Sequence, residues 1–158
     1  MKSSTKAWMV VVALALSGSA IAGTALAAAS TTASASSGDK CMDNAQSQGA
    51  MNECASNSYG AADKELNQVY QQVLRKYAKD TVFVAKLKAA QKAWLTFRDA
   101  ELAARFPDSD ITNYGSVYPM CVNNELEAMT RKRTEELRAW LKGTEEGDVC
   151  AGSYSPNS

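Results

Sequence analysis

Three stretches of the sequence repeat apolar residues at intervals of three and four positions. This spacing places apolar side chains on one face of an α-helix, so it predicts long amphipathic helices over residues 61–79, 81–105 and 120–142. The inward positions of the first are Ala62, Leu66, Val69, Tyr70, Val73, Leu74 and Tyr77. Those of the second are Phe83, Leu87, Ala90, Gln91, Trp94, Arg98 and Glu101. Those of the third are Val122, Leu126, Met129, Arg133, Leu137 and Trp140.

Polar and helix-breaking residues set the expected ends of these helices. Asp80 stands where an aspartate side chain caps the first turn of the second helix. Gly143 follows the last apolar position of the third helix and is expected to end it. Between these two helices, a polar run that contains Pro107 predicts a loop over residues 106–119.

A shorter helical piece is predicted ahead of the first long helix. It covers residues 42–56, with an interruption near Gly49, and the Ser58-Tyr59-Gly60 run is expected to separate it from the long helix. The connections between the long helices are short apart from the loop over 106–119. The expected fold is therefore all-α, a small antiparallel bundle of three long helices plus a short N-terminal helix.

The first 27 residues have a different pattern. A basic start is followed by a short uncharged apolar run and then by Ala25-Leu26-Ala27, which is typical of a cleavable secretory signal peptide. The apolar run is interrupted by serine and glycine and is short for a membrane anchor of about 20 residues. We therefore expect a periplasmic or secreted protein that has no membrane span after cleavage near Ala27.

Composition divides the remainder of the chain into three parts. Residues 28–39 are small and polar, without a large apolar side chain, and predict a flexible linker. Residues 40–150 contain the apolar stripes and form the expected single domain. Residues 151–158 resemble the linker in composition and predict a disordered tail.

Charge and the absence of histidine exclude several functions. The chain has 17 basic and 17 acidic residues, and removal of the two lysines of the signal leaves a slightly acidic protein. This composition argues against nucleic acid as a partner and is compatible with a cationic partner. Because there is no histidine, the commonest general base and the commonest metal ligand are missing. We predict no catalytic residues, no metal and no cofactor.

All four cysteines, Cys41, Cys54, Cys121 and Cys150, lie in the expected mature part. An even number in a small exported chain predicts two disulfides, for which three connectivities exist. The alternative is a cysteine-only metal site, but such sites usually contain cysteines two to four residues apart. The nearest two here are Cys41 and Cys54, so disulfides are the favoured interpretation.

Two arginines interrupt the apolar stripes, Arg98 in the second long helix and Arg133 in the third. A buried guanidinium needs polar partners, so we expect a buried polar cluster at the inward faces of the helices. Its predicted members are Asp63, Asn67, Gln91, Arg98 and Glu101. We interpret it as an ion-paired network that fixes helix register rather than as a catalytic site, since a domain of this size has little room for a cleft beside its core.

Several of these residues also carry a resemblance to the LprI-type lysozyme-inhibitor family. The similar positions begin with Cys41, Cys54, Tyr59, Asp63, Leu66, Asn67 and Tyr70. They continue through residues 87–101, LKAAQKAWLTFRDAE, which resemble the strongest motif of the family. They end with Gly115, Ser116, Tyr118, Pro119, Met120, Cys121 and the T-x2-R-T-x2-L motif over residues 130–137. The motifs occur in the expected order and cover nearly all of the folded part.

The resemblance also bears on the disulfides. Family members often have a cysteine directly after the R-D-x-E motif, where this chain has Leu102, and Cys150 is additional. The resemblance then implies a Cys41–Cys54 disulfide, with Cys150 taking the place of the missing partner of Cys121. The length of the last helix strains that second pairing, so Cys54–Cys121 with Cys41–Cys150 remains an alternative. A second departure is Tyr114-Gly115 in place of a double glycine.

The resemblance implies an exported helical binding protein that inhibits lysozyme in the cell envelope by occluding its cleft. We expect a monomer that uses the exposed loop over residues 106–119. The predicted partner-binding residues are Asp108, Ser109, Asp110, Tyr114 and Ser116. One alternative is a periplasmic adaptor or immunity-like protein that binds another protein without an effect on lysozyme. Another is an enzyme that uses Asp63, Arg98 and Glu101.

Overall fold

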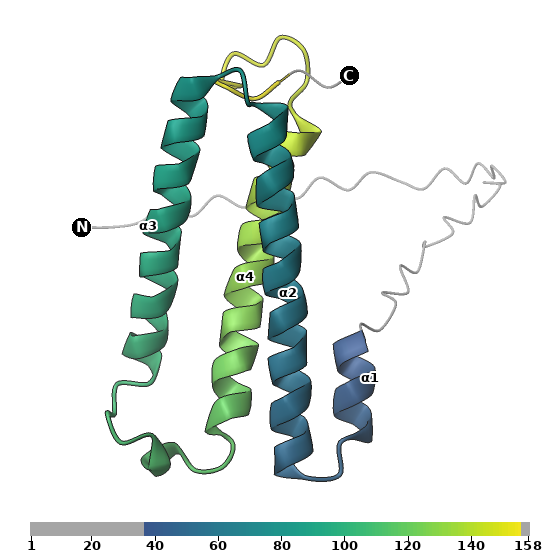
Figure 1. Ribbon diagram of the computed structural model, residues 1–158, viewed down its shortest axis with the longest axis vertical. Coiled ribbons are helices and arrows are strands. Elements are labelled where there is room, and N and C mark those ends of the chain that lie inside the picture. The colour runs from purple at the N-terminus through teal and green to yellow at the C-terminus, as the bar shows by residue number, and fades with distance from the viewer. Residues whose placement is uncertain (1–36, 156–158) are drawn as a thin grey trace, which may run out of the picture. The chain divides into compact units, whose positions relative to one another are not determined.

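The computed structural model describes residues 37–155, which form an all-α antiparallel bundle of three long helices with a short helix at its side (Figure 1). This confirms the predicted fold class. The elements in order are α1 (Ser37–Asn44), α2 (Gln48–Lys76), α3 (Thr81–Arg105), the 3-10 helix η1 (Ile111–Tyr114) and α4 (Tyr118–Lys142). The predicted signal peptide and the linker up to residue 36 lie outside the described residues. Residues 37–39, which we assigned to the linker, form the start of α1.

The predicted helix boundaries in the first half of the domain are wrong, because the short helix expected over residues 42–56 ends at Asn44 and residues 48–56 belong to the first long helix. α2 is continuous from Gln48 to Lys76 and passes through Gly60, where a break was expected. The chain breaks earlier, between α1 and Ser47, whose Oγ accepts a hydrogen bond from the Ala50 amide at 3.2 Å and caps α2. A glycine inside a helix costs only about 1 kcal/mol. Burial of Ala55 and Ala62 on either side of Gly60 offsets that cost.

The start of α3 and the end of α4 agree with the predictions from Asp80 and Gly143. The Oδ1 atom of Asp80 accepts a hydrogen bond from the Phe83 amide at 2.9 Å, which begins α3. α4 ends at Gly143, whose φ of 82° lies in the left-handed region that favours glycine. The short α2–α3 turn makes these two helices antiparallel, and the longer connection with η1 returns the chain to α4.

The core lies where α2 and α4 pack along each other, with the start of α3 against them. Its buried apolar members are Leu66, Val69, Val73, Tyr77, Phe83, Leu87 and Leu137. Towards the end of the bundle that carries η1, small side chains allow α2 and α4 to approach each other. The side chains that are fully or almost fully buried there are Ala55 and Ala62 of α2 and Thr130 and Thr134 of α4. None of the helices among the described residues combines the length and apolarity that crossing a membrane requires.

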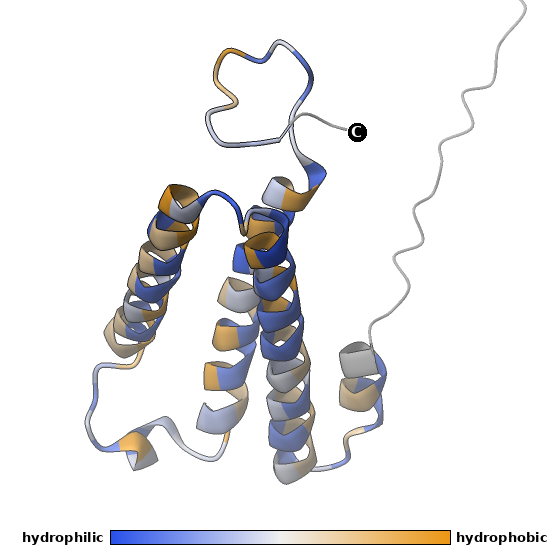
Figure 2. Ribbon diagram, turned by 45° about the horizontal axis from the view of Figure 1, so that its top comes forward, coloured by the Kyte–Doolittle hydropathy of each residue, from blue (hydrophilic) through white to orange (hydrophobic). Residues whose placement is uncertain are grey.

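α3 contributes to this core only through its first half. Its buried residues are Phe83, Leu87 and Gln91, although the helix continues to Arg105. Beyond Gln91 the apolar side chains of this fully described helix are half-buried or exposed, and Phe97 is 57% exposed. In Figure 2 the ribbon of α3 alternates between apolar and polar colouring along its length.

The C-terminal segment is ordered further than predicted. The Tyr154 ring stacks on Trp140 with centroids 3.8 Å apart. The Ser155 amide donates to the Tyr77 hydroxyl at 3.0 Å, and the Thr144 amide donates to the Ser155 carbonyl at 3.1 Å. The prediction of a disordered tail from residue 151 is therefore wrong as far as Ser155. Tyrosine stacking and a buried hydroxyl partner hold this segment, and composition alone does not reveal them.

Cys41 and Cys54 form a disulfide that links α1 to α2, as the resemblance implied. The second predicted disulfide is wrong, because Cys121 and Cys150 are both free. Cys121 lies in the first turn of α4 and Cys150 follows its end. A helix of 25 residues spans about 37 Å, and the segment that follows folds back only onto the nearer end of α4.

Candidate binding surface

The loop between α3 and α4 is the most elaborately hydrogen-bonded loop among the described residues. The Asp108 carboxylate accepts the Asp110 amide at 2.9 Å through Oδ1 and the Asn113 side-chain amide at 2.7 Å through Oδ2. Asp110 in turn caps η1, because its Oδ1 accepts the Thr112 amide at 3.0 Å and the Thr112 hydroxyl at 2.6 Å. These bonds hold the loop in one shape through local contacts.

An aromatic base supports the same loop. Tyr114 and Tyr118 stack with ring centroids 5.1 Å apart, and Phe106 meets both rings edge-on. The Tyr114 hydroxyl accepts a hydrogen bond from the Asp108 amide at 2.7 Å. Asn52 of α2 donates to the Ser116 carbonyl at 3.0 Å, so the loop is tied to the bundle as well as to itself. Such a loop loses little conformational entropy when it binds a partner.

The two carboxylates of the loop stay ionised to lower pH than ordinary aspartates, because their pKa values are lowered. Hydrogen bonds from Asp110 and Asn113 lower the pKa of Asp108, and hydrogen bonds from the side chain and the backbone of Thr112 lower the pKa of Asp110. Each bond is made to the carboxylate form and favours it. Both carboxylates are exposed to solvent, so the loop presents two negative charges.

The five predicted loop residues therefore have different roles. Asp108, Ser109 and Asp110 are exposed, and the first and last of them also shape the loop. Tyr114 is half-buried and its hydroxyl is used inside the loop. Ser116 is exposed, and its carbonyl holds Asn52. Sequence reasoning missed Ile111, which is 56% exposed on η1; an isoleucine between Asp110 and Thr112 was the available signal.

The five residues predicted to form one buried polar cluster lie in three separate places. Asp63 and Asn67 pair within α2, with Asn67 Nδ2 donating to the Asp63 carboxylate at 3.0 Å. Gln91 is buried and accepts a hydrogen bond from Arg133 at 3.1 Å, which joins α3 to α4. Arg98 pairs with its neighbour Asp99 at 2.7 Å and reaches Tyr59 of α2 at 3.5 Å. Glu101 is exposed.

This separation follows from the direction of α3. Because the second half of α3 does not enter the core, Arg98 pairs with Asp99 and Glu101 faces solvent, and neither reaches Asp63. The trio of Asp63, Arg98 and Glu101 that an enzyme would need is not connected by any ion pair among residues 37–155. The partner of Arg133 is an amide, together with Glu136 at 2.8 Å.

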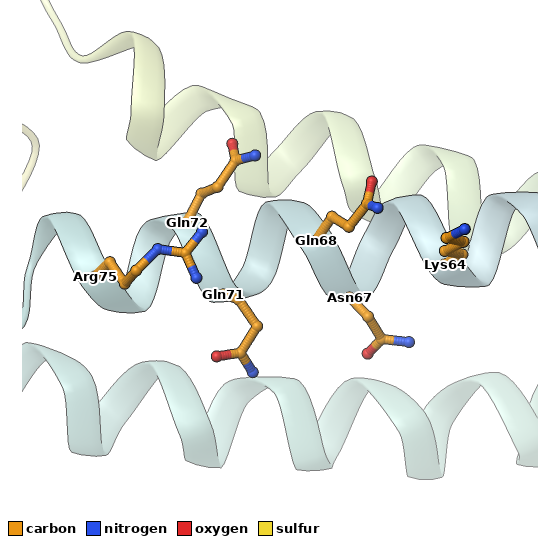
Figure 3. A pocket seen from close by; sticks show the side chains of 6 residues that line it. All are labelled: Lys64, Asn67, Gln68, Gln71, Gln72 and Arg75. Carbon is orange, nitrogen blue, oxygen red and sulfur yellow. The ribbon is translucent and has the colours of Figure 1, made fainter.

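Among the hollows on the described part of the chain, two lie along the sides of the long helices. A wide, shallow one of about 800 Å³ covers one face of α2 and is lined by Lys64, Asn67, Gln68, Gln71, Gln72 and Arg75. In Figure 3 the Asn67 and Gln71 side chains point towards α3. A narrower groove of about 260 Å³ lies between α3 and α4. No group of three metal-ligating side chains occurs in the described part of the chain.

Comparison with known proteins identifies the family of this chain. The profile of the family described as lysozyme inhibitor LprI matches residues 40–137. The chain belongs to the LprI family. It is also 34% identical over 112 residues to an uncharacterized protein of Rhizobium meliloti (strain 1021), an alignment that covers 64% of this chain and 78% of that protein. No solved structure matches the chain.

Several residues that carry the LprI resemblance join helices to one another. Tyr59 and Arg98 link α2 to α3, and Gln91 reaches Arg133 of α4. Leu137 is fully buried in the core that α4 shares with α2. These LprI positions therefore help to specify the bundle, whereas the exposed Asp108, Asp110 and Ile111 of the loop lie outside the motifs.

Proposed function

We propose that this LprI-family protein is an exported inhibitor of lysozyme that binds through the loop over residues 106–119 and occludes the lysozyme cleft. The observation that carries the proposal is the combination of rigidity and exposure in this loop. Asp108 and Asp110 hold its shape, while their remaining lone pairs and the side chain of Ile111 face solvent. Family membership supplies the class of partner.

The physical argument rests on preorganisation. A loop that enters a cleft must not lose much conformational freedom on binding, and the hydrogen bonds and stacked rings of this loop meet that requirement. Its exposed groups combine two carboxylates, the Ser109 hydroxyl and one apolar side chain. A cleft that binds sugar contains hydrogen-bonding groups and apolar surfaces of this kind, so the loop offers a complement to both.

Export to the cell envelope is part of the proposal. The expected signal peptide over residues 1–27 would deliver the protein to the compartment where wall-cleaving enzymes act. The Cys41–Cys54 disulfide supports this location, because disulfides persist in oxidising compartments. We propose that the protein acts there as a monomer that binds protein and has no catalytic activity of its own.

The test compares loop variants with a matched control in a lysozyme inhibition assay. Asp108→Asn and Asp110→Asn each remove one exposed charge from the loop and should weaken inhibition. Asp148→Asn is the control, since Asp148 accepts the Cys150 amide at 2.8 Å in a similar local turn at the opposite end of the bundle. Equal inhibition by all three variants would exclude the loop as the contact.

A second assay separates this proposal from binding to another class of protein. Purified protein is titrated against several lysozyme types, and at least one type should be inhibited in a saturable manner. If none is inhibited while envelope extract yields one stoichiometric partner that is not a muramidase, the protein is an adaptor and the proposed inhibition is wrong.

A further inference from the structure

The equal numbers of acidic and basic residues conceal an uneven distribution along the bundle. Residues 97–129 contain six acidic and two basic side chains, whereas residues 64–96 contain seven basic and two acidic ones. Because the helices are antiparallel, the first group lies at the end of the bundle that carries η1, and the second lies towards the other end (Figure 1). We refer to residues 97–129 as the acidic end.

Four of the six large apolar side chains that are exposed among the described residues lie at or next to the same end, and the other two, Val82 and Val149, lie at the opposite end. Phe97 and Ile111 are both more than half exposed, and Leu95 and Val117 are exposed to a smaller degree. Phe97 lies on the half of α3 that leaves the core, so it has no structural role in the bundle interior. An aromatic side chain in this position is typical of the anchors of protein interfaces.

The groove between α3 and α4 brings these two properties together. Its apolar lining consists of Trp94, Phe97 and Met129. Its charged lining consists of Glu101, Glu125, Lys132, Arg133 and Glu136. Its volume of about 260 Å³ suits one long side chain.

Most of the charges that line the groove are already neutralised. Glu125 pairs with Arg105 at 2.8 Å, and Glu136 pairs with Arg133 at 2.8 Å. Among the described residues, Glu101 and Lys132 make no ion pair. Glu101 is therefore the carboxylate that is available to an incoming cation, and Lys132 is the group that opposes it.

We propose that this groove receives a lysine or arginine side chain of a basic protein partner, with the aliphatic stem on Trp94, Phe97 and Met129 and the cation at Glu101. The proposal rests on the proposed function, in which that partner is the lysozyme held by the loop. The acidic end attracts a basic protein over a distance of about a Debye length and orients it before contact. The loop and the groove then bind the same partner at two points.

Charge favours a protein partner over a neutral sugar. An aromatic residue beside a carboxylate suits either ligand, since sugars also pack on aromatic rings. A neutral sugar gains nothing, however, from an excess of four negative charges across residues 97–129. A basic protein gains both the local ion pair and the long-range attraction.

The experiment measures the affinity of c-type lysozyme for four variants by calorimetry at two salt concentrations. Phe97→Ala should weaken binding about tenfold, as truncation of an aromatic anchor does. Glu101→Gln should weaken binding and reduce its dependence on salt. Lys132→Gln should strengthen binding, because it removes the opposing charge. Val82→Ala is the matched control, since Val82 is 70% exposed in the first turn of α3, at the opposite end of the helix from Phe97.

The replaced side chains are charged or more than half exposed, and circular dichroism checks that every variant folds. If lysozyme binds but Phe97→Ala and Glu101→Gln match Val82→Ala, the groove is not part of the contact and the proposed inhibition still stands. If Lys132→Gln weakens binding as much as Glu101→Gln, the assigned sign of the partner is wrong.

A second probe tests the groove without lysozyme. A short peptide of alternating arginine and leucine is titrated into the isotope-labelled protein and followed by amide chemical shifts. Shifts concentrated in residues 94–101 and 125–136 support the groove even if no lysozyme is inhibited, in which case only the proposed function is wrong. Absence of those shifts, or equal shifts with oligomers of N-acetylglucosamine, overturns the assignment to a basic protein.

Discussion

Replacement of Tyr114 by phenylalanine tests whether the order of the loop contributes to binding. The substitution removes the hydroxyl that accepts the Asp108 amide at 2.7 Å. It keeps the ring, which stacks on Tyr118 at 5.1 Å and meets Phe106 at 5.4 Å. The change therefore removes one hydrogen bond of the loop and leaves its aromatic base in place.

The expected size of the effect follows from that single bond. A hydrogen bond contributes about 1 kcal/mol net, and the loop must recover this free energy when it adopts its bound shape. A loss of about 1 kcal/mol corresponds to roughly fivefold weaker inhibition. The global free energy of unfolding should change much less, because the loop lies outside the core formed by residues such as Leu66 and Leu137.

The assay is the lysozyme inhibition constant of Tyr114→Phe measured beside Tyr118→Phe. Tyr118 has a similar ring in the same stack, and no hydrogen bond joins its hydroxyl to another described residue, so its substitution should leave inhibition unchanged. The reasoning is refuted if both variants inhibit as well as the unmodified protein. It is also refuted if they lose the same amount, because the ring and not the hydrogen bond would then matter.

Three further predictions concern stability and pH. Leu137→Ala should lower the free energy of unfolding by about 2–5 kcal/mol, because Leu137 is fully buried; a urea titration showing no loss contradicts this. Tyr77→Phe should lower it by about 1 kcal/mol and speed exchange of the Ser155 amide, which donates to that hydroxyl; unchanged exchange would show that the C-terminal segment is held otherwise. The hydrogen bonds that lower the pKa values of Asp108 and Asp110 stabilise the ordered loop at pH values above the ordinary aspartate pKa. This stabilisation is lost as the pH falls through the lowered pKa values. Loop amide shifts should therefore change only below about pH 3.9, and a transition above it contradicts the hydrogen-bond pattern.

Local sequence signals predicted the parts of the fold that depend on local contacts. The Asp80 cap and the Gly143 end each involve only a few neighbouring residues, so the sequence contains the whole interaction. The helix break predicted at Gly60 does not occur, because burial of Ala55 and Ala62 outweighs the weak tendency of glycine to disfavour a helix. Tertiary packing decided that position, and one sequence does not reveal it.

Long-range pairings were harder to predict. Helical periodicity placed Arg98 on the inward stripe, but it does not say whether a helix stays in the core along its whole length. Because α3 leaves the core after Gln91, Arg98 pairs with Asp99 and not with Asp63. The cysteines show the same limit. Their even number suggested that Cys150 pairs with Cys121, but the length of α4 places the two at opposite ends of the bundle.

The charge asymmetry was present in the sequence and became visible only through the topology. The acidic residues of positions 97–129 come from the end of one helix, a loop and the start of the next. An antiparallel hairpin of helices brings them to one end of the bundle. The net charge of the chain does not show such a distribution. The order of the charges along the chain shows it only when the antiparallel arrangement of the helices is known.

The rate of cell-wall hydrolysis by lysozyme, measured at rising concentrations of the purified protein, tests the central claim most directly. We predict that the rate falls in a saturable manner and approaches zero once the protein exceeds the lysozyme, with Asp108→Asn shifting the curve to higher concentration. A rate that stays unchanged at a large molar excess of folded protein, for every lysozyme type tried, would contradict the account.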